Sequence, residues 1–177
     1  MKPADLTRTF IIQVHLEDDT VQIREPPLRN TGHKGGIFLS RVDVMMDAPD
    51  GTKRKFLPQD IVIGQVVKIR SHKFVVHDCD EYTYRFMEEN CKQFQNSDIK
   101  IALESIRKRQ EVVTRLIITT PGLADKICTF EDVNSVMEKA NTGLMKQQIM
   151  TILRALDPQR LGVVKMTQLL KMVLNQQ

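Results

Sequence analysis

The sequence predicts an α+β protein in which an antiparallel β half precedes a helical half. Apolar residues alternate with a period of two in several short segments of residues 1–96, as they do in half-buried strands. From Ser97 onward they recur at spacings close to 3.6, as on one face of a helix. This change of period predicts two domains, residues 1–96 and 97–177.

The first domain opens with a predicted hairpin. Apolar side chains alternate over residues 10–16 and again over residues 20–24. Between them, Glu17-Asp18-Asp19 supplies short acidic side chains that accept backbone hydrogen bonds in a tight turn. Further strands are expected at residues 37–44, 66–70 and 73–77. Several short antiparallel strands joined by polar turns favour a small barrel or sandwich.

Helices follow the strands. A short helix is expected to begin near Asp80 and to direct Tyr84 and Met87 toward the barrel. The second domain should contain four longer helices, of which Thr129 begins the second as its N-cap. The predicted segments run from Ser97 to Ile118, from Thr129 to Asn141, from Met145 to Leu156 and from Met166 onward.

One segment of the second domain has the outline of a calcium loop. Laid on the twelve-residue EF-hand loop, residues 157–168 keep an acidic first position, Asp157, and a sixth-position glycine, Gly162. The bidentate glutamate of position twelve is replaced by Gln168, and position five is Leu161, which has no side-chain oxygen. Residues 120–131 are expected to form a partner loop, and Ile127 is expected to pair with Val164 in a short bridge between the two loops. The prediction is a degenerate EF-hand pair that does not bind calcium; the alternative is a generic four-helix cap.

The spaced motifs between Leu16 and Phe86 resemble the DM-ten domain, a module best known from axonemal proteins. The residues that carry this resemblance are Glu17-Asp18-Asp19-Thr20-Val21, Ile23, Glu25, Asn30-Thr31-Gly32, Phe38-Leu39, Arg41, Gly64, Phe74-Val75-Val76, Asp78-Cys79-Asp80 and Thr83. The resemblance implies a pleckstrin-homology-like β-barrel. With the EF-hand-like segment after it, the chain is similar to the myoclonin or ribbon-protein family of ciliary doublet microtubules. Members of that family usually carry three DM-ten domains, whereas this chain has one.

Composition narrows the function classes. The 177 residues carry a net charge of +4 and a pI near 9.0, which suits an acidic partner such as tubulin or an anionic lipid. Aromatic residues make up 5% of the chain, too few for the stacking platforms of single-strand nucleic-acid binders, so no nucleic acid is expected. Neither a transmembrane segment nor a secretory signal is expected. Three widely spaced cysteines predict a reducing compartment.

No set of residues predicts catalysis, a cofactor or a metal. Gly32-His33-Lys34-Gly35-Gly36 lacks the spacing of a phosphate-binding loop. His72, His77 and Cys79 have no fourth zinc ligand near them. The carboxylates around Asp80 are better explained by an N-cap than by acid–base chemistry.

Basic residues are the candidate partner-binding groups. Lys53, Arg54 and Lys55 lie on a predicted loop, and Arg70 and Lys73 flank a predicted hairpin tip. These residues suit either the acidic surface of tubulin or a phosphoinositide headgroup.

The function expected from the resemblance is a non-enzymatic structural protein of the ciliary or flagellar axoneme. It would be a microtubule inner protein in the lumen of the doublet, in contact with tubulin and other axonemal proteins. The alternative is a cytosolic phosphoinositide- or protein-binding adaptor built on a pleckstrin-homology-like barrel.

Overall fold

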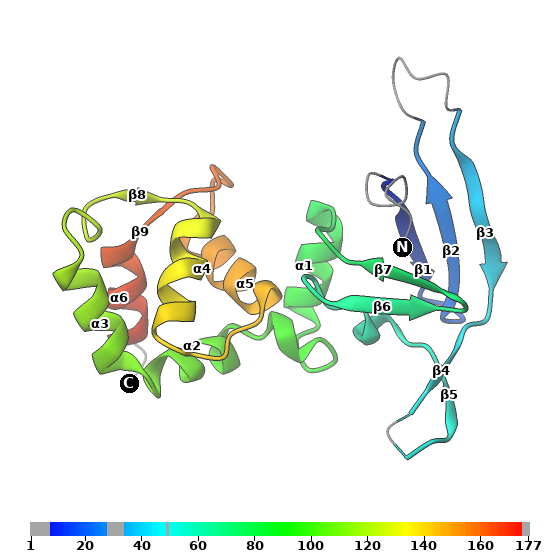
Figure 1. Cartoon of the computed structure of the whole chain (residues 1–177), viewed down its shortest axis with the longest axis horizontal. Coiled ribbons are helices and arrows are strands. Elements are labelled where there is room, and N and C mark those ends of the chain that lie inside the picture. Colours follow the sequence, from blue (N-terminus) through cyan, green and yellow to red (C-terminus); the bar gives the residue numbers. More distant parts are fainter. Residues whose placement is uncertain (1–7, 28–33, 49, 175–177) are drawn as a thin grey trace. The chain divides into compact units, whose positions relative to one another are not determined.

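A computed structural model describes residues 8–27, 34–48 and 50–174, and these residues form a mixed α+β protein of small antiparallel sheets and helices (Figure 1). The chain divides into two compact units. The strand unit comprises Met1–Ile61 and Val66–Val75, and the helical unit comprises Val62–Gln65 and Val76–Gln177. The predicted domain boundary at residue 96 stays a prediction. No helix within the described residues is long and apolar enough to cross a membrane.

The largest sheet contains the predicted hairpin. Strands β1 (Ile11–His15), β2 (Thr20–Glu25) and β3 (Gly36–Val42) are antiparallel in the order β1-β2-β3 (Figure 1). Val21 and Ile23 of the central strand are buried, as their alternation predicts.

An arginine fixes the turn of this hairpin. Asp18 accepts hydrogen bonds from the backbone N–H of Thr20 at 3.1 Å and from its hydroxyl at 2.7 Å. Arg41 of β3 donates to the same hydroxyl and to the Asp18 carboxylate, both at 2.7 Å. The hydrogen bond from the Thr20 side chain, together with that from Arg41, lowers the pKa of Asp18 to about 2. These residues belong to the motif that carries the DM-ten resemblance, and their contacts explain why the motif needs them together.

Two further hairpins complete the strand unit. Strand β4 (Met45–Asp47) pairs with β5 (Lys53–Lys55), and β6 (Val66–Ile69) pairs with β7 (His72–Val75). A short 3-10 helix, η2 (Pro58–Asp60), follows β5. Within the described residues the hydrogen-bonded strands form separate small sheets and do not close into one barrel. The pleckstrin-homology-like barrel therefore stays a prediction.

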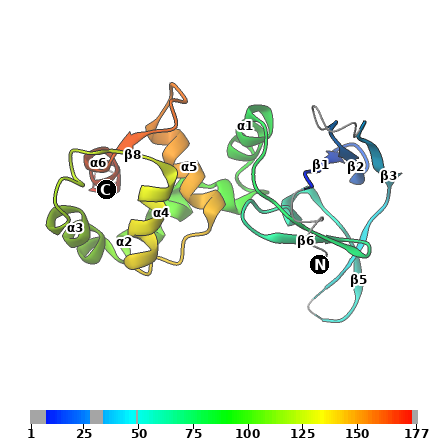
Figure 2. The same ribbon diagram turned by 45° about the horizontal axis from the view of Figure 1, so that its top comes forward.

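The helical unit contains all six α-helices of the described chain and one 3-10 helix. Their bounds are α1 (Glu81–Glu89), η3 (Gln95–Ser97), α2 (Ile99–Arg107), α3 (Gln110–Thr119), α4 (Phe130–Lys139), α5 (Lys146–Leu156) and α6 (Met166–Leu174). The predicted N-cap of α4 is confirmed, because Thr129 and Asp132 form a reciprocal capping box. The two-residue strands β8 (Ile127–Cys128) and β9 (Val164–Lys165) pair within the helical unit (Figure 1). Figure 2 shows β8 and the helices of this unit from a second direction.

One prediction about the helices is wrong. The single helix expected from Ser97 to Ile118 is broken at Arg109, whose φ of −122° and ψ of 17° are not helical. Both halves still bury their apolar side chains in one core, which includes Ile106 of α2 and Val113 of α3. Tyr84 and Met87 of α1 are buried and contact residues of α5. Their predicted direction toward the barrel stays a prediction.

Residues 62–65 belong to the helical unit because they contact the start of α5. The Ile63 N–H donates to the Gln147 side-chain oxygen at 3.0 Å, and Ile63 is 2% exposed. Gly64 has a φ of +89°, and a Cβ at this position would lie 2.7 Å from the Cβ of Lys146. Both the positive φ and the close approach therefore require glycine here. The Gln147 amide also donates to the Ser97 hydroxyl at 2.8 Å.

Candidate functional site

The EF-hand-like loop after α5 is held by its own groups. The Asp157 carboxylate accepts a hydrogen bond from the Gly162 N–H at 2.7 Å. Burial opposes ionisation of Asp157, but the backbone N–H groups of Leu161, Gly162 and Val163 outweigh it and hold its pKa below the usual value. At the other end of the loop, Gln168 accepts a hydrogen bond from the Lys165 N–H at 3.2 Å.

A cation of the protein also contributes to this loop. Arg160 has a φ of 58°, and its guanidinium donates to the carbonyl oxygens of Arg154 and, at 3.0 Å, of Asp157. Among the residues that the structure describes, no group of three or more His, Cys, Asp or Glu side chains lies together in a way that would hold a metal ion. The segment between α5 and α6 keeps Asp157 and Gly162 of the EF-hand pattern, and the degenerate EF-hand pair stays a prediction.

The bridge between the two loops differs from the prediction by one residue. Cys128 pairs with Val164, and Ile127 pairs with Lys165, so the predicted pairing of Ile127 with Val164 is wrong. The Cys128 side chain is fully buried, whereas Ile127 is 60% exposed. In the first loop, Lys126 forms an ion pair with Asp132 at 2.8 Å.

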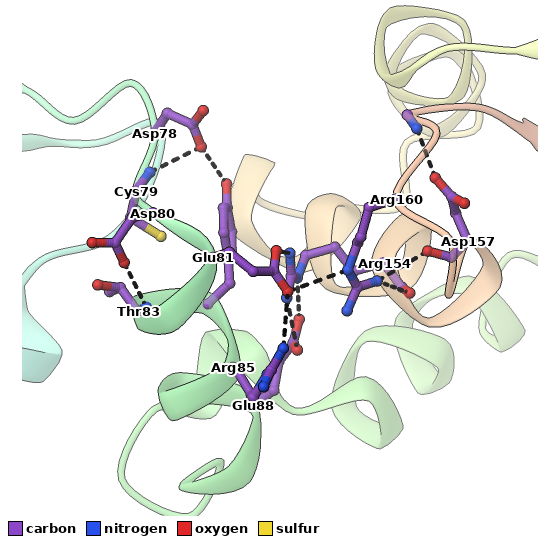
Figure 3. Close-up of polar contacts among 12 residues, drawn as sticks. Asp78, Cys79, Asp80, Glu81, Thr83, Arg85, Glu88, Arg154, Asp157 and Arg160 are labelled. Atoms are coloured by element: carbon purple, nitrogen blue, oxygen red, sulfur yellow. Dashed lines mark hydrogen bonds and ion pairs between the residues drawn. The ribbon is translucent and has the colours of Figure 1, made fainter.

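A buried arginine joins α1 to α5 (Figure 3). Arg154, with a side chain 8% exposed, donates to Glu81 at 2.6 and 3.0 Å and to Glu88 at 2.6 and 3.3 Å. Its guanidinium lies over the Tyr84 ring, 4.4 Å from the centroid. We call these four residues the Arg154 cluster. Burial opposes the charge of Arg154, but the two carboxylates outweigh it and raise the arginine's pKa.

The groups in and next to the Arg154 cluster are an ionised carboxylate, a helix N-cap and a protonated thiol. The hydrogen bond from Arg154 lowers the pKa of Glu81 to about 2. Asp80 accepts a hydrogen bond from the Thr83 N–H at 2.7 Å, which confirms its prediction as the N-cap of α1. Burial raises the pKa of Cys79 to about 12, so its thiol is protonated and poorly nucleophilic near neutral pH.

Lys53, Arg54 and Lys55 do not lie on the predicted loop but form strand β5, which pairs with β4, and each of them is paired with a carboxylate. Lys53 contacts Asp47, Arg54 donates to both oxygens of Asp60 at 2.6 and 2.7 Å, and Lys55 lies 2.9 Å from Asp43. Their charges are therefore largely neutralised within the strand unit. Arg70 and Lys73 differ, because both are exposed and neither forms an ion pair within the described part of the chain.

His72 and the glycine-rich segment at residues 32–36 were the other candidates, and the described contacts of His72 and Gly35 are packing contacts. The His72 ring packs edge-on against Phe38, with 4.9 Å between centroids. A Cβ on Gly35 would lie 2.4 Å from the Glu25 carbonyl oxygen, so this glycine permits a close backbone contact. Gly32, His33 and the Asn30-Thr31 motif lie outside the described residues.

The Arg154 cluster was not predicted from the sequence. Its signal is a cation within the apolar stripe of α5, beside Ile152 and Leu153, and two glutamates seven residues apart on α1. Lys68, which lies opposite Lys73 in the β6–β7 hairpin, was not predicted as a candidate either.

Comparison with known proteins confirms the resemblance. Residues 1–83 match the family model of the DM10 domain, the DM-ten domain of the sequence analysis. The chain is 32% identical to "EF-hand domain-containing family member C2" of Bos taurus over 86% of its length and 22% of that protein. It is 35% identical to "EF-hand domain-containing protein 1" of Mus musculus over 73% of its length and 19% of that protein. The chain thus spans about a fifth of the length of these relatives.

Proposed function

The chain carries a DM10 domain and is related to the EF-hand domain-containing proteins, and from this premise we propose that it is a non-enzymatic structural protein of the ciliary or flagellar axoneme. In its finer form the proposal is a microtubule inner protein. It would bind tubulin and neighbouring inner proteins in the lumen of the doublet. The pleckstrin-homology-like barrel is part of the same proposal.

The loop after α5 is the observation that carries this proposal. A calcium sensor changes shape because an ion supplies contacts that the loop lacks. Here Asp157 is already bonded to the loop backbone, and Arg160 is bonded to two backbone carbonyls. An EF-hand pair fixed in this way supports a static role, in which the helices present one constant surface.

The Arg154 cluster supports the same role. It connects α1, whose first residues end the DM10 match, to α5 of the EF-hand-like pair. A protein that transmits load or maintains spacing needs such connections between its elements.

A tagged copy expressed in a flagellated cell tests the proposal. The axonemes are extracted first with detergent and then with high salt. Retention along the doublets through both steps is expected, and imaging of the doublet would then locate the chain. Release by detergent, or a signal spread through the cytosol and membrane, would contradict it.

The alternative is a cytosolic adaptor that binds phosphoinositides through Lys53, Arg54 and Lys55. The carboxylate partners of these three residues argue against it, because a phosphate would have to displace them. Saturable binding to phosphoinositide vesicles, lost on changing the three residues to glutamate, would favour the adaptor.

A further inference from the structure

The outer face of the β6–β7 hairpin has an unusual charge pattern. In the hairpin register Val66 faces Val75 and Lys68 faces Lys73. These four side chains are exposed, whereas Val67 and Ile69, which alternate with them on β6, are buried. The outer face therefore presents a valine pair beside a lysine pair, and Arg70 at the tip adds a third exposed cation.

The other face of the hairpin is covered within the strand unit. Phe74 packs against Phe10 and Phe38, with ring centroids 5.3 and 6.1 Å apart. These aromatic contacts fix the orientation of the hairpin. The lysine and valine pairs are consequently held away from the covered face.

The lysine pair is unfavourable for the isolated protein. Like charges directly opposite each other on antiparallel strands destabilise a sheet. Within the described residues none of Lys68, Arg70 and Lys73 forms an ion pair. Lys68 is close enough to Asp47 for its charge to help lower the pKa of that carboxyl, but Asp47 is already bonded to Lys53. Arg70 adds a further cost, since its φ of 53° is one that residues other than glycine rarely adopt.

We propose that the outer face of the β6–β7 hairpin binds an acidic protein segment in which carboxylates alternate with apolar side chains. The carboxylates would pair with Lys68, Lys73 and Arg70, and an apolar side chain would cover Val66 and Val75. The proposal takes its partner chemistry from the charge and the valine pair and does not depend on a ciliary location. If the proposed function holds, the hairpin is the surface that meets the axonemal partner.

The two lysines of β5 provide a matched comparison. Lys53 and Lys55 are also lysines of a hairpin in the strand unit, but each has a carboxylate partner. Removing two charges from either hairpin changes the net charge equally. A difference between the two pairs therefore reports the site and not the overall charge.

The test uses the full chain and a fluorescein-labelled peptide of Glu-Val repeats, followed by fluorescence anisotropy at low salt. We expect binding that weakens with salt, and the double variant Lys68→Gln/Lys73→Gln should weaken it about tenfold. Lys53→Gln/Lys55→Gln should leave it within about twofold. A Gln-Val peptide should not bind.

A single variant separates binding from folding. Lys73→Glu places a carboxylate opposite Lys68, so it should raise the unfolding temperature by about 1–2 °C while abolishing peptide binding. Loss of binding with a lower unfolding temperature would overturn the proposal, as would equal effects of the two lysine pairs. Binding to phosphatidylserine vesicles but not to the peptide would overturn it in favour of a lipid surface.

The axonemal extraction distinguishes this inference from the proposed function. If the wild type is retained on doublets but does not bind the Glu-Val peptide, the hairpin inference fails and the proposed function stands. If the peptide result holds but the wild type is not retained, the proposed function fails and the hairpin inference stands.

Discussion

Replacing Arg154 with methionine should destabilise the helical unit by about 2–3 kcal/mol. The change removes the cation that Glu81 and Glu88 share, and it keeps an unbranched side chain beside Tyr84. Methionine is chosen because alanine would also leave a cavity, which would add a packing cost to the electrostatic one.

The magnitude follows from the exposure of the three charges. Removing one partner of a fully buried ion pair costs about 3–5 kcal/mol, because the other charge is left unpaired. Arg154 is 8% exposed and Glu88 is 25% exposed, so this pair approaches that limit. Glu81 is 48% exposed and regains water when the arginine is lost. The expected cost therefore lies below the fully buried value.

Thermal unfolding followed by circular dichroism at 222 nm measures this effect on the helices. In a protein of this size the unfolding temperature falls by about 2–4 °C for each kcal/mol of stability lost. We expect a decrease of about 5–10 °C for Arg154→Met. Arg85→Met is the matched control. Arg85 also pairs with Glu81, with 3.9 Å between guanidinium nitrogen and carboxylate oxygen, but its side chain is 67% exposed. Its effect should stay within about 0.5 kcal/mol.

Two results would refute the reasoning. Equal shifts for Arg154→Met and Arg85→Met would show that burial of the pair does not matter. A further loss on adding Glu88→Leu to Arg154→Met would show that the lone carboxylate was not the source of the cost, since its removal should restore part of the stability.

The remaining predictions concern pH, two buried side chains and calcium. Glu81 has its pKa lowered from 4.5 to about 2 in the folded chain, so its stabilising effect is present above pH 4.5 and lost as the pH falls through 2; the difference in unfolding temperature between wild type and Arg154→Met should narrow over that range. Gln147→Leu should cost about 1–3 kcal/mol in urea unfolding, because the Ile63 N–H loses its acceptor; an unchanged midpoint would show that water replaces the amide. Phe56→Ala should cost about 3–5 kcal/mol, because this side chain is fully buried in the strand unit, and unfolding followed by near-ultraviolet circular dichroism would detect it. Calcium at millimolar concentration should not shift the unfolding temperature, because Leu161 and Gln168 supply no carboxylate to the loop; a rise would contradict the degenerate EF-hand.

Local pattern was sufficient for most elements. Period-two alternation located the strands that contain Val21 and Ile69, and the capping box located the start of α4 at Thr129. The spacing of Asp157 and Gly162 marked the segment between α5 and α6, which contains β9. In each of these cases the signal and the structure lie within about a dozen residues of one another.

Longer-range features were not accessible in this way. Arg154 lies 73 residues from Glu81, and no local rule places them together. The break at Arg109 has neither proline nor glycine to mark it, so the surrounding helix formers predict continuity. Ile127 and Cys128 are both apolar, and only packing decides which one faces inward.

Gly64 has a consequence for how this protein can be divided. It lies inside the DM10 match, yet the atom that would clash with its missing side chain belongs to Lys146. A recombinant fragment ending at residue 83 would keep the whole family match. It would lose α5, the helix that residues 62–65 contact. Exchange of the helical part between relatives would face the same constraint, because a graft must bring a helix start that tolerates a backbone at this distance. The end of the DM10 match is thus a poor place to truncate the protein, because Gly64 within the match is adapted to contact Lys146 outside it.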